Sequence, residues 1–150
     1  MADHATSTGR VPVSPPASAA LAAFIDAGFV ALFVAIGRRN HDEDATVSGY
    51  LTTVAPFLVA LLVGWLALRA WRSPLTVRTG VGLWLFVVVL GMLLRRINGD
   101  GTAIAFVIVA TIFLGATLVG WRAIWAVAEP RRRRHEAARS HRSSRLPSEP

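Results

Sequence analysis

Long apolar runs alternate with short polar segments along most of this chain, and charged residues lie almost entirely at the ends of the runs. The four runs cover about residues 21–37, 54–68, 80–94 and 103–121. A helix needs roughly 20 apolar residues to cross the hydrocarbon core of a bilayer, and fewer where interfacial residues flank it. The pattern therefore predicts an all-α integral membrane bundle of four transmembrane helices.

Two polar tails flank the expected transmembrane domain, which covers residues 19–128. Residues 1–18 are rich in Ser, Thr and Pro, and residues 129–150 are rich in Arg. Because such segments cannot bury enough apolar surface to fold alone, we expect both tails to be disordered. The expected helices cover about residues 19–37, 52–70, 76–95 and 102–127.

The composition supports a membrane protein and excludes several other classes. Of the 150 residues, 53% are hydrophobic, which is rare in a soluble domain of this size. There is no cysteine, so disulfides, thiolate metal sites and cysteine nucleophiles are excluded. The pI near 11.7 would suggest nucleic-acid binding in a soluble protein. Here the arginines sit at helix ends and in one tail, so we expect no nucleic-acid partner.

The distribution of arginine predicts the orientation in the membrane. With four spans, both termini lie on one side, and 12 of the 16 basic residues, all of which are arginine, fall on that side. The positive-inside rule then places both termini in the cytoplasm, in a multi-pass protein of the bacterial plasma membrane. The run Arg131, Arg132, Arg133 and Arg134 has two interpretations. It either sets the topology alone or also binds anionic lipid headgroups, at about 1 kcal/mol per basic residue.

A nine-residue block occurs twice, first from Phe57 to Trp65 and again from Phe113 to Trp121, with seven identical positions. An arginine pair precedes each copy at nearly the same offset. Because each unit would contain two spans, both copies would insert the same way up. This pattern predicts a 2+2 parallel internal repeat about an axis along the membrane normal.

Small residues four positions apart predict close helix packing, because helices in lipid associate through close contact rather than through the hydrophobic effect. Such faces would hold a compact bundle together, or bind a second copy or a partner membrane protein. The residues concerned are Ala27, Ala31 and Ala35 in the first helix, Ala60 and Gly64 in the second, and Ala116 and Gly120 in the fourth.

Asp26 lies inside the first apolar run, where an ionisable group costs a few kcal/mol unless it faces a partner or water. Arg122 and Arg69 are candidate partners at a similar depth. Two interpretations remain open. Asp26 either forms a structural ion pair or reaches the interface, or it carries protons or cations. In the proposed repeat its equivalent is Leu83, so Asp26 breaks the internal symmetry.

A second polar group ends the first and third helices on the opposite side, and it includes Arg38, Arg39, His41 and Arg95. Arginines at helix C-termini are favoured by the helix dipole. The two arginine pairs could instead converge as a receptor for a carboxylate or phosphate. The acidic residues 42–44 are near enough in sequence to neutralise them.

No motif for catalysis or for a cofactor is evident. The run of residues 41–44 resembles a cation patch, but a single loop lacks convergent ligands, so we expect no metal and no cofactor. Because no nucleophile is paired with a base, we do not expect an enzyme. Two functions remain. One is a small transporter with its pathway between the repeats, and the other is a non-catalytic scaffold or accessory subunit that packs through small-residue faces.

Several short motifs occur in a fixed order along the chain. They are Asp26, Gly37-Arg38-Arg39-x-His41, Pro56-Phe57, Gly91-Met92-Leu93-Leu94-Arg95, Gly99-x-Gly101-Thr102 with Phe106, and Gly120-Trp121-Arg122. This series resembles a family of small bacterial and archaeal membrane proteins catalogued as domain of unknown function 3054, over about residues 20–127. The resemblance implies a four-helix integral membrane protein, most often actinobacterial, and implies no activity. It singles out Asp26, Arg38, His41, Arg95 and Arg122 for testing.

Overall fold

The described part of the chain is built from α-helices joined by short connections. A computed structural model describes residues 15–39, 46–99 and 103–143, with side chains in 18–38, 46–99 and 103–129. The prediction of an all-α protein with four apolar helices is confirmed, since each α-helix contains a segment long and apolar enough to cross a membrane. The elements are α1 (Pro15–Arg39), α2 (Val47–Ala67), the short 3-10 helix η1 (Ala70–Arg72), α3 (Val77–Ile97) and α4 (Ile104–Ser143).

The helices are longer than their apolar runs, and the expected boundaries of the tails were wrong for this reason. α1 begins at Pro15 rather than at 19, because proline is tolerated in the first helical turn. α2 begins at Val47, where the Thr46 hydroxyl accepts a hydrogen bond from the Gly49 amide and so caps the helix. α4 continues to Ser143 through a segment expected to be disordered. Arg, Ala and Glu are good helix formers, so a helix need not end where the apolar run ends.

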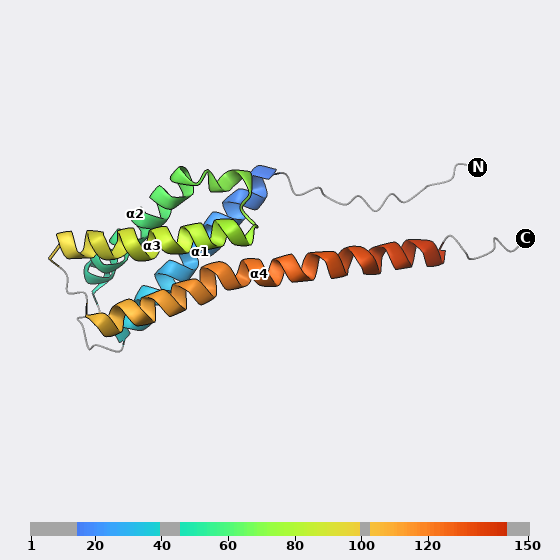
Figure 1. Cartoon of the computed structure of the whole chain (residues 1–150). Coiled ribbons are helices and arrows are strands. Elements are labelled where there is room, and N and C mark those ends of the chain that lie inside the picture. Colours follow the sequence, from blue (N-terminus) through green and yellow to red (C-terminus); the bar gives the residue numbers. More distant parts are fainter. Residues whose placement is uncertain (1–14, 40–45, 100–102, 144–150) are drawn as a thin grey trace, which may run out of the picture.

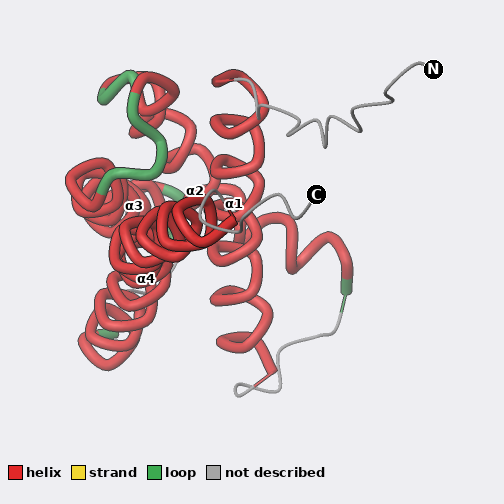
Figure 2. Tube along the Cα trace, turned by 90° about the vertical axis from the view of Figure 1, so that its right-hand side faces the viewer, coloured by secondary structure: helices red, strands yellow, loops and turns green. Residues whose placement is uncertain are grey.

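Consecutive helices run antiparallel and lie side by side, so that α1 contacts α2 and α4, and α3 contacts the same two helices from the other side (Figures 1 and 2). One end of the bundle, called the η1 end below, carries the beginning of α1, residues 68–76 and the later part of α4. α4 runs well past the other helices there (Figure 1).

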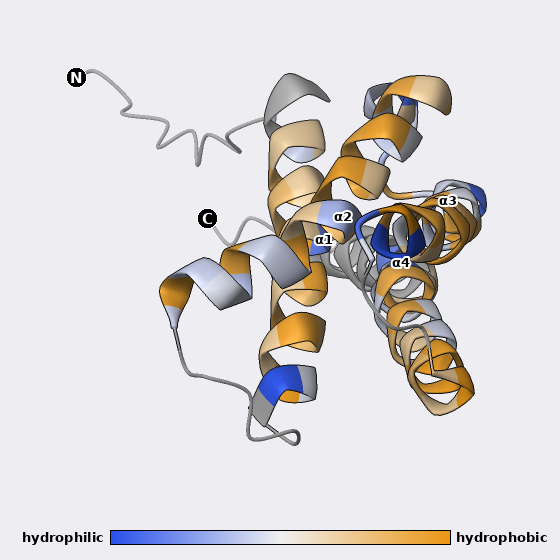
Figure 3. Ribbon diagram, turned by 90° about the vertical axis from the view of Figure 1, so that its left-hand side faces the viewer, coloured by the Kyte–Doolittle hydropathy of each residue, from blue (hydrophilic) through white to orange (hydrophobic). Residues whose placement is uncertain are grey.

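Apolar residues cover most of the exterior of the four helices, as expected for a lipid-facing surface (Figure 3). Inside, aromatic rings from three helices pack together, with Phe33 in contact with Phe57, Phe106 and Phe113 at centroid distances of 5.6 to 5.8 Å. Glycine makes room for this packing. A Cβ atom on Gly91 would lie 2.6 Å from the ring of Phe57, so α3 approaches α2 closely at this level.

The two copies of the repeated block lie in different surroundings. Ala60 is buried, and a Cβ atom on Gly64 would lie 3.0 Å from Phe86 of α3, so this copy packs against a neighbouring helix. Ala116 is exposed, and a Cβ atom on Gly120 would meet nothing within 4 Å. The internal repeat itself stays a prediction.

Candidate functional site

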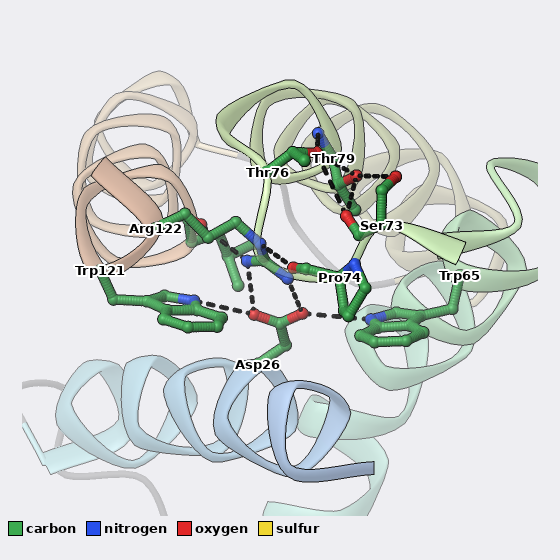
Figure 4. A network of polar contacts seen from close by, with 9 residues as sticks. Asp26, Trp65, Ser73, Pro74, Thr76, Thr79, Trp121 and Arg122 are labelled. Carbon is green, nitrogen blue, oxygen red and sulfur yellow. Dashed lines mark hydrogen bonds and ion pairs between the residues drawn. The ribbon is translucent and has the colours of Figure 1, made fainter. Parts of the chain in front are cut away.

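The Asp26 carboxylate is fully buried and accepts four hydrogen bonds from side chains of two other helices (Figure 4). Arg122 donates from Nη1 to Oδ1 at 2.8 Å and from Nη2 to Oδ2 at 2.7 Å. The indole of Trp121 donates to Oδ1 and that of Trp65 donates to Oδ2, each at 3.1 Å. These four residues, called the Asp26 clasp below, join α1, α2 and α4.

Arg122 is equally well supplied with partners. Its Nε donates to the carbonyl oxygen of Pro74 at 2.8 Å, and its Nη1 also donates to the carbonyl oxygen of Leu118 at 2.8 Å. The guanidinium carbon lies 4.5 Å from the centroid of the Trp121 ring, within range of a cation–π contact. The guanidinium therefore connects α4 to α1 and to the connection between η1 and α3.

A network of hydroxyl groups fixes the backbone that Arg122 contacts. Thr79 Oγ1 donates to the carbonyl oxygen of Ser73 at 2.8 Å, and Thr76 Oγ1 donates to the same oxygen at 3.1 Å. Thr76 also caps α3, because its side chain accepts a hydrogen bond from the Thr79 amide. These contacts hold the turn that presents the Pro74 carbonyl to Arg122 (Figure 4).

Gly80 lets Arg122 pass between α3 and α4. A Cβ atom at this position would lie 2.8 Å from the carbonyl oxygen of Leu118 and 2.9 Å from Cδ of Arg122. Only a residue without a side chain allows the two backbones to approach this closely while the arginine reaches Asp26. The ion pair therefore depends on a glycine of a helix that does not contribute either charge.

Buried charges are costly unless they are paired and hydrogen-bonded. In the Asp26 clasp, both carboxylate oxygens have two donors, and the Arg122 guanidinium has acceptors on Nε, Nη1 and Nη2. Asp26 and Arg122 are each 0% exposed. Of the alternatives for Asp26, this geometry favours the structural ion pair.

The predicted residues at the opposite end have contacts of a different kind. Arg38 Nη1 donates to the carbonyl oxygen of Gly49 at 3.1 Å and to the hydroxyl of Thr53 at 3.0 Å, which ties the end of α1 to the start of α2. The guanidinium of Arg95 lies over the ring of Phe106, 4.8 Å from its centroid. The two arginines thus contact different groups, and none of these contacts forms a shared receptor.

Several predicted residues lie where the structure gives no side-chain contacts. His41 is outside the described residues, and for Arg39 only the helical backbone is described. The tetra-arginine run 131–134 is likewise described only as part of α4. In α1, Ala27, Ala31 and Ala35 are partly buried.

The role of the two tryptophans was missed in the sequence, where Trp65 and Trp121 served only as markers of the repeat. A buried indole N–H normally requires an acceptor, and both tryptophans end the apolar run of a helix on the side from which Asp26 is reached. That requirement was the available signal. Since the two residues are equivalent in the proposed repeat, the duplicated block supplies one donor to each oxygen of a single carboxylate.

No curated protein and no solved structure matches this chain. A family model does match it, over residues 23–125, and its description is "Protein of unknown function (DUF3054)". The matched segment contains Asp26, Trp65, Trp121 and Arg122, and so includes the whole clasp. The chain therefore belongs to the DUF3054 family.

Proposed function

We propose that this protein is a non-catalytic membrane scaffold or accessory subunit. The observation that carries the proposal is the closed Asp26 clasp. A carrier must release its ionisable group from one set of partners during each cycle, whereas four N–H donors hold this carboxylate on both oxygens. Breaking one partner of a buried pair typically costs about 3–5 kcal/mol, so the arrangement suits a permanent joint between helices.

The exterior of α4 supports the same proposal. Ala116 and Gly120 lie four residues apart on an otherwise bulky apolar helix, and neither contacts another helix of this chain closely. In lipid, such a pair lets a second helix approach, and close packing is then the main source of affinity. The helix of a partner membrane protein or of a second copy would lie on this face.

We further propose a plasma-membrane location with both termini in the cytoplasm. The η1 end carries the exposed residues Arg69, Arg72 and Arg78, and α4 leaves the bundle at the same end with a run of arginines. This asymmetry supports the orientation given by the positive-inside rule.

Transport is the competing function, and flux through reconstituted vesicles distinguishes the two. Vesicles with the protein, vesicles with Asp26→Asn and empty vesicles would be given a pH gradient and a membrane potential, and internal pH would be followed with a dye. A scaffold predicts that all three leak at the same rate. Flux in the wild type that Asp26→Asn abolishes would establish a carrier and refute the proposal.

A photo-crosslinking residue at position 120 tests the scaffold role directly in cell membranes. We expect a discrete adduct from this position and none from the same residue at Val89, which is exposed on α3. Two differently tagged copies of the chain would show whether the adduct is a homodimer. Equal crosslinking at both positions would count against the small-residue face.

A further inference from the structure

The part of α4 beyond its membrane span is a strongly basic helix that neither the clasp nor the scaffold proposal uses. The candidate span ends at Glu129, and the helix continues to Ser143. This α4 arm, residues 130–143, would be about 21 Å long at 1.5 Å per residue. It carries a single acidic residue, Glu136. Its basic residues are Arg131, Arg132, Arg133, Arg134, His135, Arg139, His141 and Arg142.

Helical spacing gathers several of these residues along one side of the arm. Relative to Arg131, His135 is at i+4, Arg139 at i+8 and Arg142 at i+11. At 3.6 residues per turn, these four positions share one face of the helix. A continuous basic face of this kind matches an extended anionic surface better than a single small anion.

Other parts of the η1 end carry the same charge. Arg69, Arg72 and Arg78 are all exposed beside the start of α3. Trp71 and Trp125 are 47% and 44% exposed, and such half-exposed indoles favour the headgroup region of a bilayer. Positive charge from two separate segments therefore lies close to the expected membrane surface.

The step from the membrane span to the arm contains a proline. Pro130 follows the last residue of the span directly and lies inside α4. Because proline has no N–H, one backbone hydrogen bond of the helix is lost there, and helices bend most readily at such a position. The arm can thus incline toward the bilayer without ending the helix.

We propose that the α4 arm lies along the membrane surface and binds anionic phospholipid headgroups through its arginines. Charge complementarity selects this occupant, since the arm is joined directly to a membrane span and basic residues next to a span are attracted to anionic lipid. The inference does not depend on the scaffold proposal.

The test uses the full chain with Ser140→Cys, which introduces its only thiol, labelled with a fluorescent donor. The protein would be reconstituted into vesicles that contain a headgroup-labelled acceptor lipid in either phosphatidylcholine or a mixture with phosphatidylglycerol. We expect at least twofold higher energy transfer with phosphatidylglycerol, and a loss of that increase at high salt. Replacing the four residues Arg131–Arg134 with glutamine should reduce transfer to the phosphatidylcholine level.

The matched control is Arg96→Gln, an exposed arginine at the opposite end of the bundle, which should leave the effect intact. Circular dichroism would verify that the glutamine variant keeps its helices. Transfer that is equal in both lipids would overturn the proposal and leave the arginines as topology determinants alone. An equal loss in Arg96→Gln would also overturn it, because the effect would then follow net charge rather than the arm.

Discussion

At the scale of single residues, the structure concentrates its polar chemistry in one buried group. Asp26 lies within an apolar helix, and its charge is balanced by Arg122 across the bundle. Trp65 and Trp121 complete the set of donors, one on each carboxylate oxygen. Because water is excluded, each group depends on the others, and removing one leaves a buried charge or a buried donor without its partner.

Asp26→Asn should therefore lower the free energy of unfolding by about 3–5 kcal/mol, since Arg122 would keep its charge without a buried counter-charge. Equilibrium unfolding in mixed micelles would measure the change. Arg122→Gln and the double variant complete a cycle. We expect the double variant to be less destabilised than the sum of the single changes, by about 1 kcal/mol or more. Additive effects would show that the two side chains act independently.

At the scale of secondary-structure elements, glycines set how closely the helices approach. Gly80 lies against the backbone of α4 at Leu118, and Gly91 lies against the ring of Phe57. A backbone atom cannot move aside as the end of a flexible side chain can. The spacing between α3 and α4 is therefore fixed at the level of the clasp, where Arg122 crosses from one helix to the other partners.

Gly80→Ala should destabilise the bundle by about 1–3 kcal/mol, because the added methyl group forces α3 and α4 apart. Gly120→Ala is the control within the same helix pair, since nothing lies within 4 Å of the new atom and alanine favours a helix. Thermal unfolding of both purified variants in detergent would compare them. A similar loss in both variants would mean that the close approach at Gly80 has no energetic weight.

At the scale of the whole molecule, four antiparallel spans bring the start of α1, η1 and the later part of α4 to one end. The arginine-rich segments and the Asp26 clasp belong to this end, whereas Arg38 and the aromatic contacts of Arg95 belong to the other. An even number of spans requires that both chain ends lie on the same side of the membrane.

A topology reporter fused after Pro150 should report the cytoplasm, because most arginines lie on that side. The same reporter inserted between α1 and α2 should report the other side. Alkaline phosphatase and a fluorescent protein, which are active on opposite sides of the membrane, would provide the two measurements. If both insertion points report the same side, the four-span topology is incorrect.

The sequence by itself determined the four spans and the isolation of Asp26, because the length of an apolar run decides whether a segment enters a bilayer. It also placed Arg122 among the candidate partners. It could not set the ends of the helices, since backbone hydrogen bonding continues past the apolar run in α1 and α4.

Only the tertiary structure decided which donors reach Asp26. Trp65 is 39 positions away and Arg122 is 96 positions away, so their contacts depend on how α1, α2 and α4 pack. Packing also separated the two copies of the repeat, burying Gly64 against α3 and leaving Gly120 open. Similar local sequences took different roles because side-chain volume and helix placement, rather than local pattern, fix the contacts within a bundle.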